Sequence, residues 1–168
     1  MPSPLEIKRQ ENHERREREQ LLQLLPDNLA AAFETADFIY SQDYLESLPL
    51  YPWEITDPAK AATQDYATYI RTDFDHPDHV REFLTQSILH FEPPALCWLG
   101  QGPVFRLTAP LEARDFAAVP KLTDLRICLA DERFTRGFVF SQYLGYLPGD
   151  RATPKRETVY ELVYFSSS

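Results

Sequence analysis

The stretch LCWLGQGPVFRLT, residues 96–108, contains the clearest signal for the fold. Two runs rich in β-forming residues, 96–99 and 104–108, flank a Gly- and Pro-containing turn, a pattern typical of a β-hairpin. Further strands are predicted over residues 122–129, 137–143 and 158–165. Because strands joined by short connections pair antiparallel, the second half of the chain predicts an antiparallel sheet of about five strands.

The first half of the chain is predicted to be helical. Apolar residues recur at steps of three and four from Leu29 to Tyr44, which indicates a helix over residues 27–47. Two more helices are predicted over residues 58–72 and 77–91, each with a proline at its first position. We therefore expect an α+β fold in which N-terminal helices pack on one face of the antiparallel sheet.

The N-terminus is predicted to be a polar helix outside the core. Residues 8–20 contain no apolar side chain, and opposite charges four residues apart favour a helix. A helix that is polar all round cannot pack into a core. We expect residues 1–25 to form an extension, either simply solvated or used to bind a partner, and residues 26–168 to form a single α+β domain.

Composition excludes several classes of function. The 168 residues carry a net charge of −9 with a pI near 4.9, which argues against nucleic acid and anionic membranes as ligands. No apolar run approaches the roughly 18 residues of a membrane span, and no secretory signal is visible, so we expect a cytoplasmic protein. Cys97 and Cys128 lie in apolar runs and are predicted to be buried free thiols.

The net charge is concentrated in one stretch. Residues 27–79 hold eleven carboxylates against two bases, whereas the segments on either side are balanced. The same stretch carries five tyrosines and a tryptophan. Carboxylates steer and pair with a basic partner, and Tyr and Trp anchor protein interfaces. This combination predicts a surface that binds a basic protein.

The predicted partner-binding site combines acidic and aromatic side chains of this stretch: Asp37, Tyr40, Asp43, Tyr44, Glu46, Tyr51, Trp53 and Glu54. The leading hypothesis is a small interaction protein without enzymatic activity. In its sharper form this is an inhibitor or immunity-type protein that neutralises a basic toxin or a nucleic-acid-binding enzyme, because acid can take the place of phosphate in a positive cleft.

A second cluster contains possible metal ligands: Asp73, Asp75, His76 and His79. Two His three residues apart with carboxylates around them are compatible with a transition metal. The competing interpretation is an ordinary helix N-terminus, where Asp is favoured by the helix dipole. No third His or Cys stands at a suitable spacing, so no metal and no cofactor are expected.

Two other functions stay open. The helices and sheet could form a cone with an aromatic pocket for a small ligand or a reaction, in which Asp73, His76 or His79 would act as acid or base. No nucleophile-elbow or phosphate-loop motif supports catalysis, and no catalytic residue is assigned. Alternatively, the chain is a subunit of a larger assembly, docked through its N-terminal helix.

Overall fold

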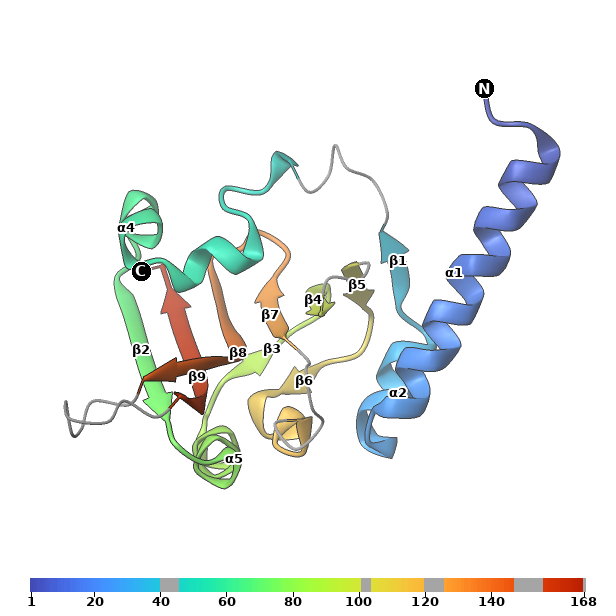
Figure 1. Cartoon of the computed structure of the whole chain (residues 1–168). Coiled ribbons are helices and arrows are strands. Elements are labelled where there is room, and N and C mark those ends of the chain that lie inside the picture. Colours follow the sequence, from blue (N-terminus) through green and yellow to red (C-terminus); the bar gives the residue numbers. More distant parts are fainter. Residues whose placement is uncertain (40–45, 101–103, 120–125, 147–155, 168) are drawn as a thin grey trace.

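An antiparallel sheet forms the centre of the molecule, as a computed structural model shows (Figure 1). The structure describes residues 1–39, 46–100, 104–119, 126–146 and 156–167. The sheet has seven strands, and from edge to edge they are β1 (Asp37–Ile39), β5 (Val104–Leu107), β4 (Ala95–Leu99), β7 (Ile127–Asp131), β8 (Arg136–Tyr146), β9 (Arg156–Ser166) and β2 (Thr68–Phe74). A separate two-stranded sheet pairs β3 (His90–Phe91) with β6 (Leu111–Glu112).

The predicted fold class is confirmed, and the two strands of the predicted hairpin, β4 and β5, pair with each other, whereas residues 101–103 of the predicted turn lie outside the described residues. All five residues of β4 are buried, and β4 pairs with β5 through Cys97 and Phe105. A strand buried on both faces reads as a continuous apolar run, which is why the stretch around Cys97 stands out in the sequence. Cys97 and Cys128 are free and fully buried, and burial raises the pKa of both thiols.

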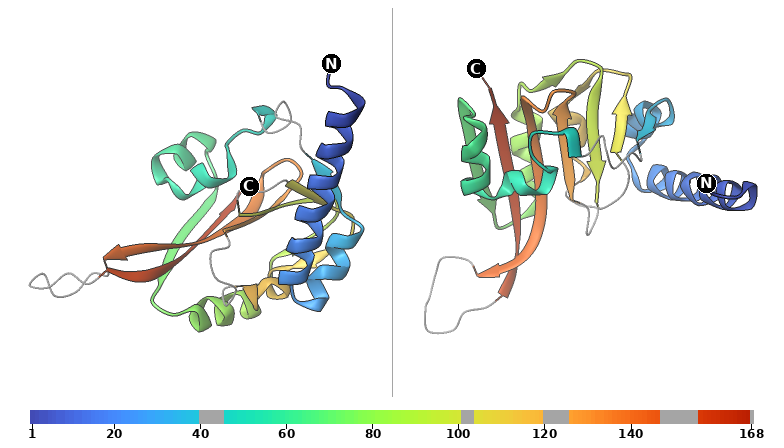
Figure 2. Two further views of the ribbon diagram at one scale, coloured as in Figure 1. Left: turned by 45° about the vertical axis from the view of Figure 1, so that its right-hand side comes forward. Right: turned by 90° about the horizontal axis from the view of Figure 1, so that it is seen from above.

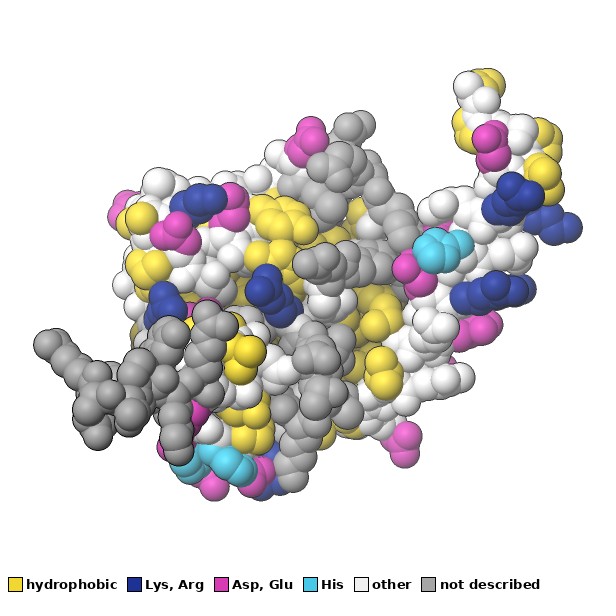
Figure 3. Space-filling view, viewed as in Figure 1, with side chains coloured by type: hydrophobic (Ala, Val, Ile, Leu, Met, Phe, Trp, Pro, Cys, Tyr) yellow, Lys and Arg dark blue, Asp and Glu magenta, His cyan; other side chains and the backbone are white. Residues whose placement is uncertain are grey.

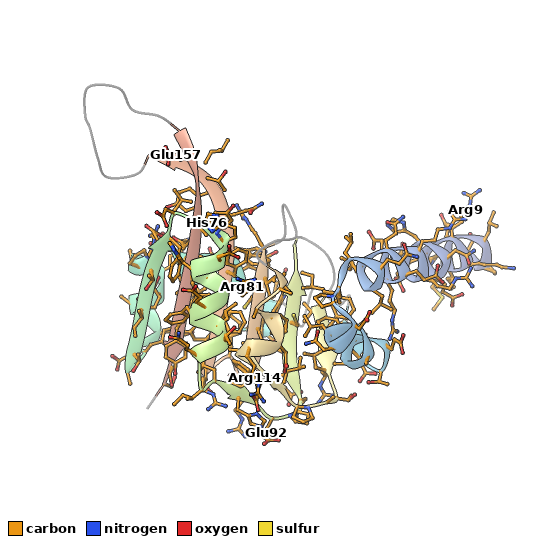
Figure 4. The ribbon with its side chains drawn as sticks, turned by 90° about the horizontal axis from the view of Figure 1, so that it is seen from below. Arg9, His76, Arg81, Glu92, Arg114 and Glu157 are labelled. Carbon is orange, nitrogen blue, oxygen red and sulfur yellow. The ribbon has the colours of Figure 1, made fainter. Side chains whose placement is uncertain are left out.

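Helices cover one face of the sheet, here called the first face (Figure 4). Helix α2 (Asp27–Glu34) contributes Leu29 and Phe33, and helix α5 (Pro77–Gln86) contributes Val80 and Leu84. The short helix η3 (Ala113–Phe116) completes this layer. Alternate residues of the strands, such as Leu129, point into the same core.

The opposite, second face is covered by residues 46–66, here called the capping segment. Seen from above, this segment crosses the strands on the side away from α5 (Figure 2). It contains η1 (Pro52–Thr56), α4 (Pro58–Ala61) and η2 (Ala62–Gln64). Leu50 and Ile55 are buried against the strand residues of this face.

Helix α1 (Pro4–Leu24) extends away from the sheet (Figure 1). Ser3 caps its start by accepting a hydrogen bond from the Glu6 backbone N–H, and none of its residues is buried. Its last turns attach to the domain, since Leu22 packs against the first-face core and Arg18 donates to the backbone carbonyls of Phe33 and Glu34. No helix in the described part of the chain is long and apolar enough to cross a membrane.

Three helix boundaries predicted from the sequence are wrong. The helix expected over residues 27–47 ends at Glu34, and the chain then pairs with β5 as strand β1. The helix expected over residues 58–72 is limited to α4, and Thr68–Phe74 forms the edge strand β2. Helix α5 ends at Gln86, before β3. Strand pairing therefore overrides the local helical pattern, and the acidic stretch supplies both outer strands.

The sheet requires a glycine at position 137. A Cβ built on Gly137 would lie 2.4 Å from the Leu129 carbonyl oxygen and 2.9 Å from the Ala130 Cα, both backbone atoms of β7. The ring of Phe165, the residue paired with Gly137 on β9, occupies the remaining space at 2.8 Å. At Gly145 the nearest atom instead belongs to the Tyr143 side chain, which is 37% exposed.

We predict that Gly137→Ala lowers the free energy of unfolding by about 1–3 kcal/mol, because the added methyl overpacks two backbone segments. Gly145→Ala is the matched control, and it costs less than about 1 kcal/mol because the Tyr143 ring can move. Urea unfolding followed by tryptophan fluorescence measures both. Equal losses in the two variants would contradict this account of the packing.

Candidate functional site

Four of the eight predicted binding residues lie in the capping segment. Tyr51 is 44% exposed, Glu46 is exposed, and Trp53 and Glu54 are half-buried. Asp37 lies elsewhere, on edge strand β1 opposite Arg106. The other three, Tyr40, Asp43 and Tyr44, lie outside the described residues. The structure thus brings together the second half of the predicted site.

Hydrogen bonds attach the capping segment firmly to the sheet. The Tyr69 hydroxyl of β2 donates to the Ile55 carbonyl at 2.7 Å, and the Tyr66 hydroxyl donates to the Phe134 carbonyl, between β7 and β8, at 3.4 Å. Within the segment, the Gln64 amide donates to the Pro49 carbonyl at 3.1 Å. Tyr66 packs against Phe165, and burial raises the pKa of Tyr66 to about 12. The segment is therefore a fixed platform, although it contains little regular secondary structure.

The outer side of this platform is acidic. The capping segment contains four carboxylates and one base: Glu46, Glu54, Asp57, Asp65 and Lys60. Lys60 forms an ion pair with Glu54, and this contact lowers the pKa of Glu54. Asp57 caps α4 by accepting from the Ala59 N–H at 2.9 Å. Figure 3 shows carboxylates around α4 with hydrophobic side chains exposed beside them.

The acidic stretch as a whole does not form one patch. It begins on α2, includes β1, the capping segment and β2, and ends in the first turn of α5; β1 and β2 are opposite edges of the sheet. Asp37 and Asp73 are therefore separated by the full width of the sheet. Asp75 and Asp78, at the start of α5, interact with His79 and Arg81. Among the described residues of the stretch, the capping segment carries four carboxylates, and one of them, Glu54, is paired with Lys60.

A polar hollow of about 220 Å³ opens at the border of the capping segment. Trp53 and Thr56 of the segment form one wall, and the strands supply the other side chains: Arg71, Arg126, Ser141, Gln142, Tyr143 and Glu161. This volume is below the roughly 300–1,000 Å³ of typical small-molecule pockets. The hollow is suited to a single polar group rather than to a whole ligand.

The floor of this hollow is an ion pair between the buried Glu161 and the exposed Arg71. The Glu161 side chain is 5% exposed; one of its oxygens lies 2.5 Å from Arg71 Nη2, and the other accepts from the Ser141 hydroxyl at 3.2 Å. Burial raises the pKa of the Glu161 carboxyl, and Arg71 and Ser141 oppose that rise. Since Arg71 also donates to the Thr56 carbonyl at 3.5 Å, the pair links β9 to the capping segment through β2.

The possible metal ligands do not converge. His76 Nδ1 accepts from the Asp78 N–H as the N-cap of α5, and His79 Nδ1 lies 2.9 Å from Asp75. Asp73 belongs to β2, where it lies near Arg71. Among the described residues, no group of three or more His, Cys, Asp or Glu side chains could hold a metal ion. His76 and the neighbouring carboxylates act here as helix-start residues (Figure 4).

Sequence reasoning found Trp53 but missed the side chains that the sheet brings to the hollow, because they come from β2, β8, β9 and the residue before β7. One signal was available. Val159, Glu161, Val163 and Phe165 alternate with residues of the other face, so Glu161 is the one charged residue in an otherwise apolar inward series. A buried carboxylate needs a charged or hydrogen-bonding partner, and here Arg71 of β2 provides the charge.

These features describe an α+β protein with an acidic cap on one face of a seven-stranded antiparallel sheet. A family model described as "YokC prophage protein" matches residues 3–164. The chain therefore belongs to the YokC prophage protein family, and the match includes α1 as well as the sheet. Comparison with curated proteins and with solved structures gives no match.

We predict that Arg71→Met lowers the free energy of unfolding by about 2 kcal/mol at neutral pH, because it leaves the Glu161 carboxylate buried without its charged partner. Arg71→Met/Glu161→Gln recovers part of this loss, since a neutral amide needs no counter-charge. Arg106→Met is the control, because its partner Glu132 is exposed; it costs less than about 1 kcal/mol.

The pH dependence of the same variant provides a second readout. Burial raises the pKa of Glu161 above its ordinary value of 4.5, so the folded state binds the proton more tightly than the unfolded state. The contribution of this group to stability therefore falls as pH rises from 4.5 through the folded-state pKa. Without Arg71 that pKa is higher still, so the deficit of Arg71→Met is smaller at pH 5 than at pH 7. A deficit independent of pH would contradict this assignment.

Proposed function

We propose that this protein is a small interaction protein that binds a basic protein surface through its capping segment. The observation that carries the proposal is the arrangement of that segment: four carboxylates and the exposed Tyr51 lie on a platform that Tyr69 and Ile55 hold to the sheet. Its single base, Lys60, is paired within the segment. A rigid acidic surface with an aromatic anchor attracts a basic partner at long range and holds it at short range.

The hollow beside Trp53 adds a polar contact point to this surface. Arg71 and Arg126 face it from the sheet, and Glu161 lies at its floor. A partner side chain that reaches past the capping segment would meet these groups in a partly desolvated place, where charged hydrogen bonds discriminate between partners. The hollow therefore supports specificity, whereas the carboxylates of the capping segment support attraction.

The sharper form of the proposal is an inhibitor or immunity-type protein. A nuclease or a basic toxin presents a positive cleft, and carboxylates on a fixed platform can occupy it in place of phosphate. Membership of a family of prophage proteins is compatible with this role.

We predict that binding is salt-sensitive and depends on the capping segment. The wild-type chain, used as bait in a lysate of its source organism, captures a basic protein at low salt and releases it at high salt. With that protein purified, Glu46→Lys slows association about tenfold, and Tyr51→Ala mainly speeds dissociation.

Glu82→Lys is the matched control for this experiment, because Glu82 is an exposed carboxylate on α5, on the other face of the sheet. It makes the same charge change as Glu46→Lys and leaves association within about twofold of wild type. Capture of an acidic protein would rule out the capping segment as the binding surface. An equal slowing of association by Glu46→Lys and Glu82→Lys would rule it out as well.

Helix α1 supports a second candidate, the docking arm of a larger assembly. All of its residues are at least partly exposed, it extends away from the sheet, and its N-terminal turns carry the exposed apolar residues Leu5 and Ile7 (Figure 1). Among the described residues, Arg18 and the leucines that follow it attach the helix to the domain.

Deletion of residues 1–14 distinguishes the two functions. If the capping segment is the binding surface, the shortened chain binds the captured protein with affinity within about threefold of the full chain. If α1 is the docking arm, the shortened chain keeps its fold, measured by the same urea unfolding curve, but fails to bind.

A further inference from the structure

Strand β2 presents an open sheet edge. It is the last strand in the sheet and pairs only with β9 among the described strands, over seven consecutive residues. The opposite edge strand, β1, has three residues. An edge of this length offers a row of backbone N–H and C=O groups to another strand.

The sequence of β2 is complementary to itself in antiparallel orientation. Pairing that places Thr72 opposite Thr72 of a second copy puts Arg71 opposite Asp73 and Ile70 opposite Phe74, each twice by symmetry. Thr–Thr, opposite-charge and aromatic–β-branched pairs are the favourable kinds of cross-strand pair. Centring on Arg71 or on Asp73 would instead place like charges against each other, and a centre at Ile70 would leave Asp73 without the pair to Arg71, so Thr72 is the centre that matches both charges.

The exposed side chains of the edge fit this arrangement. Ile70 is 49% exposed on the first face, and Phe83 of α5, which is 39% exposed, packs on Phe74 with ring centroids 6.0 Å apart. Pairing at Thr72 would cover Ile70 with Phe74 of the other copy. On the second face Arg71 lies opposite Asp73 of the other copy in this register, and within its own chain it lies 3.9 Å from Asp73 and contacts Glu161.

We propose that two copies of this chain associate through their β2 strands, in antiparallel register centred on Thr72, to form one continuous sheet. The two-fold axis passes between the paired Thr72 residues, so the interface is the same patch on both copies. Thr72 can face Thr72 of the other copy as a hydrogen-bonded or as a non-hydrogen-bonded pair, because both kinds of antiparallel pair allow a two-fold axis at this residue. Few side chains are buried, so the dimer is at the weak end of specific interfaces and depends on concentration.

Cysteine crosslinking of the full-length chain tests the register. Directly opposite residues of antiparallel strands have Cα atoms about 4.5–5.5 Å apart, which suits a disulfide. Thr72→Cys therefore gives a covalent dimer under mild oxidation, whereas Thr68→Cys, about 26 Å from its copy in this register, does not. The native Cys97 and Cys128 are buried and do not interfere. Equal crosslinking of the two variants would overturn the proposal.

Sedimentation velocity over a concentration series tests the association itself. The wild-type chain shifts from monomer to dimer as concentration rises, and Ile70→Lys weakens the dimer about tenfold or more because it places lysine at the paired edge. Ile88→Lys is the matched control, because Ile88 is 97% exposed and outside any strand; it leaves the dimer unchanged. A wild-type chain that is monomeric at every soluble concentration would overturn the proposal.

Discussion

The structure depends on the burial of both faces of its central strands. Every residue of β4 is buried, and four of the five residues of β7 are buried as well. Such strands cannot be stable with one face in water, so the rest of the chain has to supply two covers. Helices α2 and α5 form one of them. The other is the capping segment, which inserts Leu50 and Ile55 and has little regular secondary structure.

This difference between the two covers explains how the charge is distributed. A helix buries one apolar stripe and leaves its other positions to solvent. The charged residues at those positions of α5 pair with each other within the helix, as Arg81 does with Asp78. The capping segment touches the sheet at a few points, and much of its remaining length is exposed. Its carboxylates therefore lie on a surface whose shape is set by the core beneath, and a partner would meet a preorganised array rather than a flexible loop.

The sequence predicted the parts of the fold whose environment is simple. The strands β4 and β5 are apolar on both faces except at Arg106, so their composition alone identifies them. Residues 37–39 follow a helical pattern in the sequence but form a strand, because they pair with the backbone of β5. Residues 68–74 alternate between two faces, with Thr68, Ile70 and Thr72 on one, but the preceding aromatic spacing also suits a helix. Local periodicity cannot decide such cases, because the energy difference lies in tertiary pairing.

The candidate site likewise has one part that the sequence predicts and one part that only the tertiary pairing reveals. Tyr51, Trp53 and Glu54 are neighbours in the chain, and a proline-rich segment between core elements indicates that they lie near the surface. The position of Arg71 and Glu161 beside Trp53 depends on the register of β2 with β9. This register places Asp73 opposite Glu161, and Arg71 lies two residues before Asp73 on the same face of β2. The same register fixes Tyr69 under Ile55 and sets which β2 side chains reach the open edge. A shift of one residue would turn Arg71 to the first face and leave Glu161 buried without its charge partner. The same shift would remove the Tyr69 contact and release the capping segment. The capping segment, the hollow and the β2 edge therefore all depend on the pairing of β2 with β9.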